Sequence, residues 1–373
     1  MEGVNSAALL SSFPASQFAF AYGSGVFPQP GAPSPAGPPM LDVVLAVDDA
    51  EAWHAENLAR NPQHYTWLAR AAGARAISRV QNSTFGARMW YNAMVPVPPA
   101  ALAPAVAPLA SSPSPPPLRT MKYGVITTAA LQADLLAWTT LYVAGRLHKP
   151  VRRLGGALPP AAPLRGALEA NLRSALCAAL LTLPAQFSAV QLFTAVSALS
   201  YTGDWRMAVG ENPHKVRNIV AGSLPHFHAL YAPLLAHPPF SQLLSAEGGG
   251  FSMDVTPRAR AEVGLRLPLR LQRLMADAKD GCGGGGGGSG SGGALVGCAT
   301  DCSSARTALR EPRLAALWAG ASAAGRLRPA LAGIVGAPAR GQSLIGIVTA
   351  GPVKAAAYAA AKLAKAALGA LKG

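Results

Sequence analysis

A glycine-serine turn followed by a single acid is the combination of residues in this 373-residue chain that could do chemistry. Gly23-Ser24-Gly25 comes directly after the apolar run Phe18 to Tyr22, and Asp42 stands near the start of a second apolar run, Met40 to Val47. Glycines have no side chain, so backbone N–H groups and a small hydroxyl can approach a triphosphate closely. Such tripeptides also form plain turns, and the turn alone does not distinguish the two interpretations.

Asp42 favours the phosphate interpretation. A carboxylate in an apolar strand is costly to bury unless it binds a cation or a hydrogen-bond partner. A Gly-Ser turn followed by such an acid is the arrangement of nucleotidyltransferases, in which the acid holds Mg²⁺ against the phosphates of a nucleoside triphosphate. We therefore expect Asp42 to be a metal ligand.

A second acid is missing two residues further along, where the chain has Val44 and many nucleotidyltransferases have an acid. A two-metal site that deprotonates a hydroxyl nucleophile is therefore not indicated. A nucleophile that is already anionic, such as a phosphate monoester, needs no general base. Asp48 is an alternative second ligand, but six residues of strand span about 20 Å. We expect Asp48 to cap the following helix instead.

Two buried strands, Phe18 to Tyr22 and Met40 to Val47, must position these residues. The simplest division of the chain is an α/β domain over residues 1–150, interrupted by a disordered proline-rich insertion at 96–119, and a mostly helical domain over 151–280. Further strands are expected at Arg88 to Val95 and Met121 to Thr127, and helices at residues 5–13, 48–60, 64–72, 131–144, 164–183 and 189–199.

The C-terminal region has a different composition. Gly281 to Gly293 is almost pure Gly and Ser, which predicts a flexible linker. In the region 294–373, an amphipathic helix is expected at about 352–371, with its lysines on one face. From Pro312 to the end of the chain there are eight Lys or Arg and no Asp or Glu. Such a basic tail favours the phosphates of a nucleic acid or of an anionic membrane.

Several classes of protein are disfavoured. No window reads as a membrane span, and the uncharged stretch Met94 to Leu118 contains nine prolines. No signal or transit peptide is readable. Four cysteines, one of them the isolated Cys177, indicate a reducing compartment. Cys282, Cys298 and Cys302 lack a fourth ligand nearby, so we do not expect zinc.

A series of ordered motifs resembles the mitochondrial translocator assembly and maintenance family, whose members are peripheral CDP-diacylglycerol synthases, also called phosphatidate cytidylyltransferases. The similarity covers roughly residues 8 to 280 and, more weakly, Gln342 to Ala350. The motifs are FAFAYGSGVF, MLDVVLAVDDAEAWH, NLARNPQHY, WYN, MKYGVI, LYVAGRLHKPV, LSYTGDWRM and QSLIGIVTA.

The resemblance implies a nucleotidyltransferase-superfamily domain with a mixed sheet, a winged-helix-like domain and a C-terminal helix that binds an anionic membrane. The implied reaction is CTP plus phosphatidate giving CDP-diacylglycerol and pyrophosphate with Mg²⁺, which supplies cardiolipin synthesis. The implied location is the matrix face of the mitochondrial inner membrane, where the protein is peripheral. The missing second acid agrees with this chemistry, because phosphatidate is a phosphate monoester.

The resemblance also assigns site residues. Asp42 would hold the metal, and Ser24 and Lys122 would act with it in catalysis. His54 belongs to the family pattern, but we expect it to be a core histidine with satisfied hydrogen bonds. For the cations of the site, the alternative interpretation is a solvated surface charge. The residues expected to bind CTP or to close the cleft are Tyr22, Gly23, Ser24, Gly25, Tyr123, Arg146, Lys149, Tyr201, Asp204 and Arg206.

Two other functions remain compatible with the sequence. The same turn and acid in a basic chain suit a nucleotidyltransferase for RNA or a small metabolite, although we do not expect nucleic acid as a partner. A non-catalytic membrane adaptor for protein import is the third interpretation. Binding of CTP distinguishes the adaptor from both enzymes.

Overall fold

The computed structural model describes residues 3–28, 39–102, 119–155, 160–207, 214–278, 312–319 and 323–350. The expected glycine-rich linker, the expected helix at 352–371, the cysteines after Cys177 and most of the proline-rich insertion lie outside these residues.

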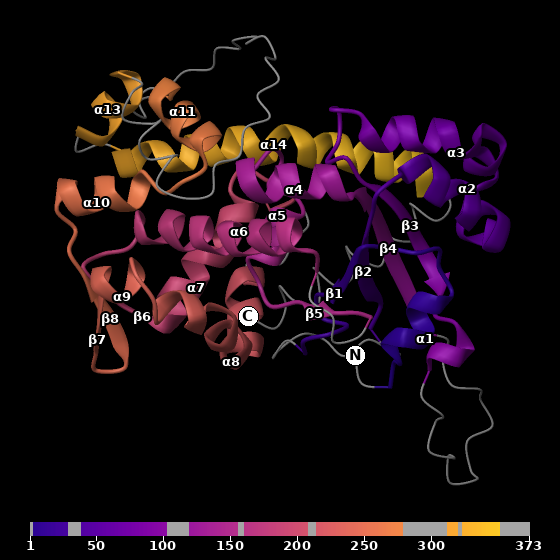
Figure 1. The fold of residues 1–373 in the computed structure, drawn as a ribbon, viewed down its shortest axis with the longest axis horizontal. Coiled ribbons are helices and arrows are strands. Elements are labelled where there is room, and N and C mark those ends of the chain that lie inside the picture. Colours follow the sequence, from indigo (N-terminus) through magenta and orange to yellow (C-terminus); the bar gives the residue numbers. More distant parts are fainter. Residues whose placement is uncertain are drawn as a thin grey trace, which may run out of the picture.

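A mixed five-stranded sheet forms the centre of the N-terminal half (Figure 1). The strand order is β3-β4-β2-β1-β5, with β2 and β4 parallel and the other neighbours antiparallel. The four strands expected from the apolar runs are present, so the α/β class is confirmed. The strands are β1 (Phe18–Tyr22), β2 (Leu41–Val47), β3 (Trp90–Pro96), β4 (Thr120–Thr127) and β5 (Arg152–Arg153).

The side chains of these strands point alternately to the two faces of the sheet, and each face belongs to a different hydrophobic core. Phe20 and Val44 face the large core that continues into the C-terminal half, whereas Ala21 and Val43 face a smaller core beneath α1 (Ser6–Ser11) and α2 (Ala50–Arg60). Successive side chains of a strand point to opposite faces. Tyr22, Asp42 and Lys122 therefore lie on the face of the large core.

The N-terminus of α2 corrects one expectation. Asp49, not Asp48, is the cap, because its carboxylate accepts hydrogen bonds from the backbone N–H groups of Glu51 and Ala52. The exposed Asp48 carboxylate instead accepts a 2.6 Å hydrogen bond from Gln17 Nε2. The helix begins one residue later than Asp48 would require.

Two of the expected helical ranges adjoin or contain a break. The expected end at Ala72 is confirmed, because Gly73 has a φ of 76° and a ψ of 170°, which are not helical, and a second helical segment follows it; the two segments together are α3 (Trp67–Asn82). The helix expected over 131–144 is divided into α4 (Thr128–Ala137) and α5 (Ala144–Leu147). Trp138 and Leu141 have positive φ values between them, which interrupts the helical turn.

The C-terminal half begins with the order helix, strand, three helices and two strands. It contains a three-stranded sheet with the order β6-β8-β7 and ends in a group of short helices. Its elements are α6 (Ala162–Leu180), β6 (Gln186–Ser188), α7 (Ala189–Ala198), α8 (Lys215–Leu235), α9 (Phe240–Leu243), β7 (Leu244–Glu247), β8 (Gly250–Met253), α10 (Pro257–Gly264) and α11 (Leu269–Asp277). The described 3₁₀ turns are η1 (Pro62–His64), η2 (Pro99–Ala101), η3 (Leu199–Tyr201) and η4 (Trp205–Met207).

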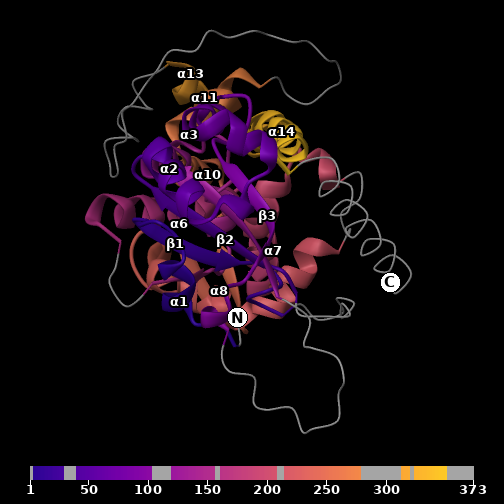
Figure 2. The same cartoon turned by 90° about the vertical axis from the view of Figure 1, so that its right-hand side faces the viewer.

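The 28-residue helix α14 (Ala323–Ala350) was not expected from the sequence. It follows α13 (Pro312–Ala319) and runs along both halves of the molecule to the edge of the sheet (Figures 1 and 2). At that edge Gln342 Oε1 accepts a hydrogen bond from the Ala87 N–H, and Gln342 Nε2 donates to the Met89 carbonyl. No described helix is long and apolar enough to cross a membrane.

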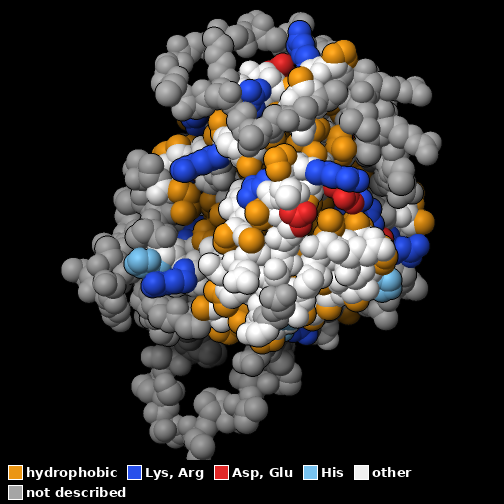
Figure 3. Space-filling view, turned by 90° about the vertical axis from the view of Figure 1, so that its left-hand side faces the viewer, with side chains coloured by type: hydrophobic (Ala, Val, Ile, Leu, Met, Phe, Trp, Pro, Cys, Tyr) orange, Lys and Arg blue, Asp and Glu red, His pale blue; other side chains and the backbone are white. Residues whose placement is uncertain are grey.

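The end of the molecule formed by α10, α11 and α13 carries both signs of charge. Figure 3 shows acidic side chains among Lys and Arg side chains on this face. Two of the ion pairs in this region are Arg266 with Glu262 and Arg313 with Asp277.

Candidate active site

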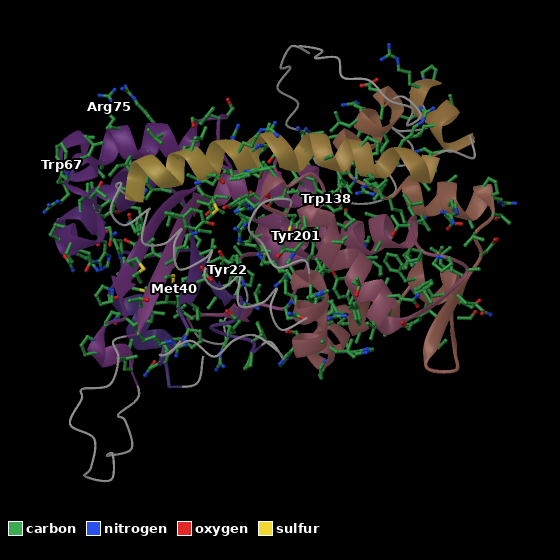
Figure 4. All side chains as sticks on the ribbon, turned by 180° about the vertical axis from the view of Figure 1, so that it is seen from behind. Tyr22, Met40, Trp67, Arg75, Trp138 and Tyr201 are labelled. Atoms are coloured by element: carbon green, nitrogen blue, oxygen red, sulfur yellow. The ribbon has the colours of Figure 1, made fainter. Side chains whose placement is uncertain are left out.

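Three side chains from neighbouring strands form a row at the end of the sheet. Tyr22 on β1 lies opposite Asp42 on β2, and Asp42 lies opposite Lys122 on β4. All three point to the same face, and Tyr22 lies near Met40 and the middle of the molecule in Figure 4. The sheet therefore brings together the acid, one cation and one aromatic residue that the sequence predicted.

The turn after β1 fits closely against this row. Gly23 has a φ of 78°, and a Cβ built on it would lie 3.3 Å from Asp42 Oδ2. A Cβ on Gly25 would collide with the carbonyl oxygen of Met40. Arg119 Nη2 donates a 3.0 Å hydrogen bond to the Gly25 carbonyl and braces the turn from the start of β4. Only glycine fits at both positions, and Ser24 lies between them.

Arg146 of α5 is the central cation of the site. Its guanidinium lies 4.0 Å from the ring centroid of Tyr142 and 5.2 Å from that of Tyr22, and it donates a hydrogen bond to the Tyr142 carbonyl. Lys122 Nζ lies 4.3 Å from the ring centroid of Tyr91 on β3. Cations over aromatic faces are stabilised without being neutralised, so their charge remains available to a ligand.

The charges of this cluster act on its tyrosines. Burial alone would raise the pKa of Tyr142, but the charges of Arg146, Lys122 and Arg206 outweigh burial and lower it. Burial raises the pKa of Tyr22, against the opposing effect of Arg146. Tyr91 and Tyr142 were not among the predicted site residues, although both stand in the motifs WYN and LYVAGRLHKPV that carry the family resemblance.

Asp134 of α4 positions the segment that carries Tyr142 and Arg146. Its Oδ1 accepts from the N–H groups of Thr140 and Leu141 and from two threonine hydroxyls, and its Oδ2 accepts from the N–H groups of Val143 and Ala144. The carboxylate is buried and caps the start of α5. Sequence reasoning missed it; the signal was an acid among the apolar residues of a helix.

The C-terminal half contributes a second group of cations. Lys149 Nζ donates a 2.8 Å hydrogen bond to Ser200 Oγ and lies 4.9 Å from the ring centroid of Tyr201, which Lys215 approaches to 5.3 Å. Tyr201 lies between α14 and the body of the C-terminal half in Figure 4. Burial, together with the charges of Arg146 and Lys215, lowers the pKa of Lys149 to about 7.

Asp204 and Arg206 form an ion pair beside this group. Arg206 Nη2 lies 2.6 Å from Asp204 Oδ2 and Arg206 Nε lies 2.9 Å from Asp204 Oδ1, so the contact is bidentate. Burial alone would raise the pKa of Asp204, but the hydrogen bonds and charge of Arg206 hold it below its usual value. Asp204 thus orients Arg206, whose charge also reaches Tyr142.

Tyr123 is separated from the other predicted residues. It is fully buried on the opposite face of the sheet, where its hydroxyl accepts hydrogen bonds from Asn57 Nδ2 and Asn92 Nδ2. His54 belongs to the same polar network: Tyr65 Oη lies 2.8 Å from its Nδ1, and Gln81 Oε1 accepts from its Nε2. The expectation that His54 is a satisfied core histidine is confirmed.

The arrangement suits a polyanionic ligand. Lys122, Arg146 and Asp42 lie near Tyr22, which the glycine turn follows directly, and Lys149 is close enough to Arg146 for their charges to interact. Among the described residues, no group of three or more His, Cys, Asp or Glu could hold a metal ion by itself. Mg²⁺ is commonly bound by one or two carboxylates together with substrate phosphates. Asp42 beside the glycine turn fits this way of binding Mg²⁺, with one carboxylate from the protein and the remaining ligands from the substrate phosphates.

Comparisons with known proteins show which family this chain resembles. A family model described as mitochondrial phosphatidate cytidylyltransferase matches residues 6–365. A Xenopus laevis protein of that name is 37% identical over 359 residues, which are 96% of this chain and 93% of the relative. The Bos taurus protein is 41% identical over 272 residues, 73% of each chain. The Danio rerio protein is 36% identical over 361 residues, with coverages of 96% and 93%.

Proposed function

Because the chain belongs to the family of mitochondrial phosphatidate cytidylyltransferases, we propose that it transfers the cytidylyl group of CTP to phosphatidate and releases pyrophosphate. The observation that carries the proposal is the row of Tyr22, Asp42 and Lys122 beside the glycine turn. The lipid product, CDP-diacylglycerol, would supply cardiolipin synthesis.

The reaction is a displacement at the α-phosphorus of CTP. A phosphate oxygen of phosphatidate forms the new bond to this phosphorus, and the bond to the oxygen that bridges the α- and β-phosphates breaks. The electron pair leaves with pyrophosphate. No proton has to be removed from the nucleophile, because a phosphate monoester is already anionic, and this explains how a site with one carboxylate suffices.

The chain's residues have separate roles in this proposal. The turn Gly23-Ser24-Gly25 binds the triphosphate with backbone N–H groups and the Ser24 hydroxyl. Asp42 would hold Mg²⁺, which when bound supplies positive charge against the triphosphate. Lys122 and Arg146 stabilise the negative charge that moves to the leaving pyrophosphate.

The second group of cations faces the lipid side of the reaction. Arg206 is placed to bind the phosphatidate phosphate, with Asp204 holding it in position. Lys149, which Ser200 holds, is close enough to Arg146 for their charges to interact, so it binds the CTP triphosphate as well. Two anionic substrates must approach each other, and fixed cations on both sides reduce their repulsion. Tyr201 stacks beneath Lys149 and Lys215 and completes this part of the site.

The order of elements supports the finer assignment of the fold. The mixed sheet with one parallel pair suits a nucleotidyltransferase-superfamily domain over residues 1–150. The order α6, β6, α7, α8, α9, β7, β8 and the sheet order β6-β8-β7 suit a winged-helix-like domain over 151–280. With this assignment, the site would lie where the two domains meet.

A peripheral position at the matrix face of the mitochondrial inner membrane completes the proposal. It is supported by the word mitochondrial in the names of the relatives and by the basic, amphipathic sequence at 352–371, which would lie on an anionic membrane surface.

The test uses CTP labelled in either its α- or its γ-phosphate. With phosphatidate present, we expect α-label in a chloroform-soluble lipid and γ-label in pyrophosphate, in equal amounts. Phosphatidate replaced by RNA or by glycerol 3-phosphate should give no labelled product. Transfer of α-label to RNA, and none to lipid, would favour the alternative nucleotidyltransferase; neither CTP binding nor label transfer would favour an adaptor.

A further inference from the structure

Large apolar side chains are exposed at the end of the molecule where α3 and α14 meet. Trp67 is 73% exposed and Phe85 is 59% exposed, and Leu68, Val80 and Leu344 are also exposed. We call the surface formed by α3, residues 83–88 and the C-terminal part of α14 the α3–α14 face. It faces the viewer in Figure 2, and Trp67 lies on it in Figure 4.

An apolar cavity opens into this face. It has a volume of about 280 Å³ and is lined from three directions, by α3 residues such as Ile77 and Val80, by Phe85 and by Leu344 and Ile345 of α14. No charged side chain lines it. Soluble surfaces rarely leave a contiguous patch of this kind uncovered unless it contacts a partner.

Arginines surround the patch. Arg70, Arg75 and Arg79 of α3 are exposed, as are Arg88 and Arg340. Helix α3, the segment 83–89 and helix α14 contain no Asp or Glu. Within the part of the chain that the structure describes, none of the five arginines forms an ion pair. The opposite end of the molecule differs, because acids lie beside its arginines (Figure 3).

We propose that the α3–α14 face docks onto an anionic lipid bilayer, with Trp67, Leu68 and Phe85 entering the boundary between headgroups and acyl chains. Tryptophan prefers this boundary, and each Arg near an anionic surface adds attraction. A second copy of the chain is disfavoured as the occupant, because a symmetric contact would bring arginines against the same arginines without an acid. The proposal rests on the proposed lipid substrate but uses residues outside its site.

The face is connected rigidly to the site. Gln342 of α14 holds both Ala87 and Met89 by hydrogen bonds, and the hydroxyl of Tyr91 donates to Met89 Sδ at 3.4 Å. Tyr91 in turn lies beneath Lys122. A bilayer that holds the face therefore also fixes the orientation of the site relative to the lipid surface.

Sedimentation of the full chain with vesicles tests the proposal. The vesicles contain phosphatidylcholine and phosphatidate at a roughly 3:1 molar ratio, and vesicles of phosphatidylcholine alone serve as the reference. Trp67→Ser combined with Phe85→Ser, and separately Arg70→Glu with Arg75→Glu and Arg79→Glu, should each weaken binding at least about tenfold. Val190→Ser and Arg165→Glu, both at exposed positions of the C-terminal half, should bind as the unaltered chain does.

A second readout locates the contact. Brominated lipids in the same vesicles should quench tryptophan fluorescence less in Trp67→Phe than in the unaltered chain. Three results would overturn the proposal. They are equal quenching in Trp67→Phe and the unaltered chain, unchanged vesicle binding by both sets of face variants, and binding of the unaltered chain to phosphatidylcholine vesicles that is as tight as its binding to vesicles with phosphatidate. A dimer that Trp67→Ser with Phe85→Ser converts to a monomer, without an effect on vesicle binding, would overturn it in favour of a second copy.

Failure of the proposed function gives a different result. Turnover of a water-soluble, short-chain phosphatidate should be unaffected by the face variants, because none of these residues lies in the site. Asp42→Asn should lose that turnover and still bind vesicles. If neither the unaltered chain nor any variant turns over CTP, but vesicle binding depends on Trp67 and the α3 arginines, the proposed function fails and the docking face stands.

Discussion

Asp42 and Lys122 are register partners on the parallel strands β2 and β4, with their side chains on the same face of the sheet. A carboxylate and an ammonium group placed in this way can bind the two charged parts of one ligand. The carboxylate can bind the metal ion, and the ammonium group can bind the phosphate that the ion accompanies. Tyr22 on the other side of Asp42 and the turn that follows it close this end of the row. The relationship depends on the parallel pairing, which joins two strands that are far apart in sequence.

The turn should not tolerate a methyl group at position 25. In Gly25→Ala the new Cβ would collide with the Met40 carbonyl oxygen and displace the turn. We expect the Kd for CTP, measured by calorimetry, to rise at least about tenfold, with little change in thermal stability. Gly166→Ala on α6 is the control, because nothing lies within 4 Å of its Cβ position. Unchanged CTP affinity in Gly25→Ala would show that the turn does not bind the triphosphate.

Binding of CTP should take up a proton near pH 8 through Lys149. Burial lowers the pKa of Lys149 to about 7 in the free protein, so its amine is mostly neutral at pH 8. Triphosphate favours the charged form and raises this pKa, so most of one proton is taken up on binding. Calorimetry in two buffers with different ionisation enthalpies measures that uptake.

Two further outcomes follow from the same pKa of Lys149. CTP affinity should fall as pH rises above 7, and Lys149→Arg should abolish the proton uptake, because a guanidinium stays charged. An identical uptake in Lys149→Arg would assign the proton to another group.

Asp134 should act on catalysis through the position of Arg146. In the unaltered chain, four backbone N–H groups donate to the Asp134 carboxylate. In Asp134→Asn an amide NH₂ group replaces one of the accepting oxygens, and the loss of hydrogen bonds should lower the free energy of unfolding by about 2–4 kcal/mol. At a temperature where the variant is folded, kcat should still be reduced, because Arg146 is displaced. Asp277→Asn, at an exposed position, is the matched control. Full activity of folded Asp134→Asn would contradict the positioning role.

Acid should destabilise the chain through two buried histidines. Burial lowers the pKa of His54 to about 4 and that of His148 to about 3. The unfolded chain takes up these protons at higher pH than the folded chain, so the free energy of unfolding decreases as pH falls below about 6.5. Each histidine contributes up to about 1.4 kcal/mol per pH unit between about 6.5 and its folded pKa.

Denaturant unfolding at pH 7 and pH 5 measures this dependence. His54→Gln should be less stable than the unaltered chain at pH 7 but should lose less stability between the two pH values. His237→Gln, at an exposed position, should show the same loss as the unaltered chain. An unchanged loss in His54→Gln would mean that His54 is not the buried neutral group.

The sequence predicted the elements that are decided locally. The strands β1 and β2 follow from short apolar runs, and the turn at Gly23 and the acid at Asp42 could be found from residue types alone. The position of Tyr123 could also have been anticipated, because alternation along β4 sends it to the opposite face from Lys122.

Features that depend on distant contacts were not predictable in the same way. Helix α14 is defined by its packing along both halves, although Pro329 and Pro338 in its sequence suggest interruption. The break between α4 and α5 depends on hydrogen bonds to Asp134. The helical periodicity of the sequence continues across this break and therefore predicted one helix over 131–144. The pKa of Tyr142 is lowered by the charges of Arg146, Lys122 and Arg206, and these residues come from three separate parts of the chain.

The most direct test is pyrophosphate release by the purified chain with CTP, phosphatidate and Mg²⁺, compared with Asp42→Asn. We predict release that requires phosphatidate and equals the CDP-diacylglycerol formed, and a kcat at least about a hundredfold lower in Asp42→Asn with an unchanged circular dichroism spectrum. Release at the same rate by folded Asp42→Asn, or no phosphatidate-dependent release by the unaltered chain, would contradict the account.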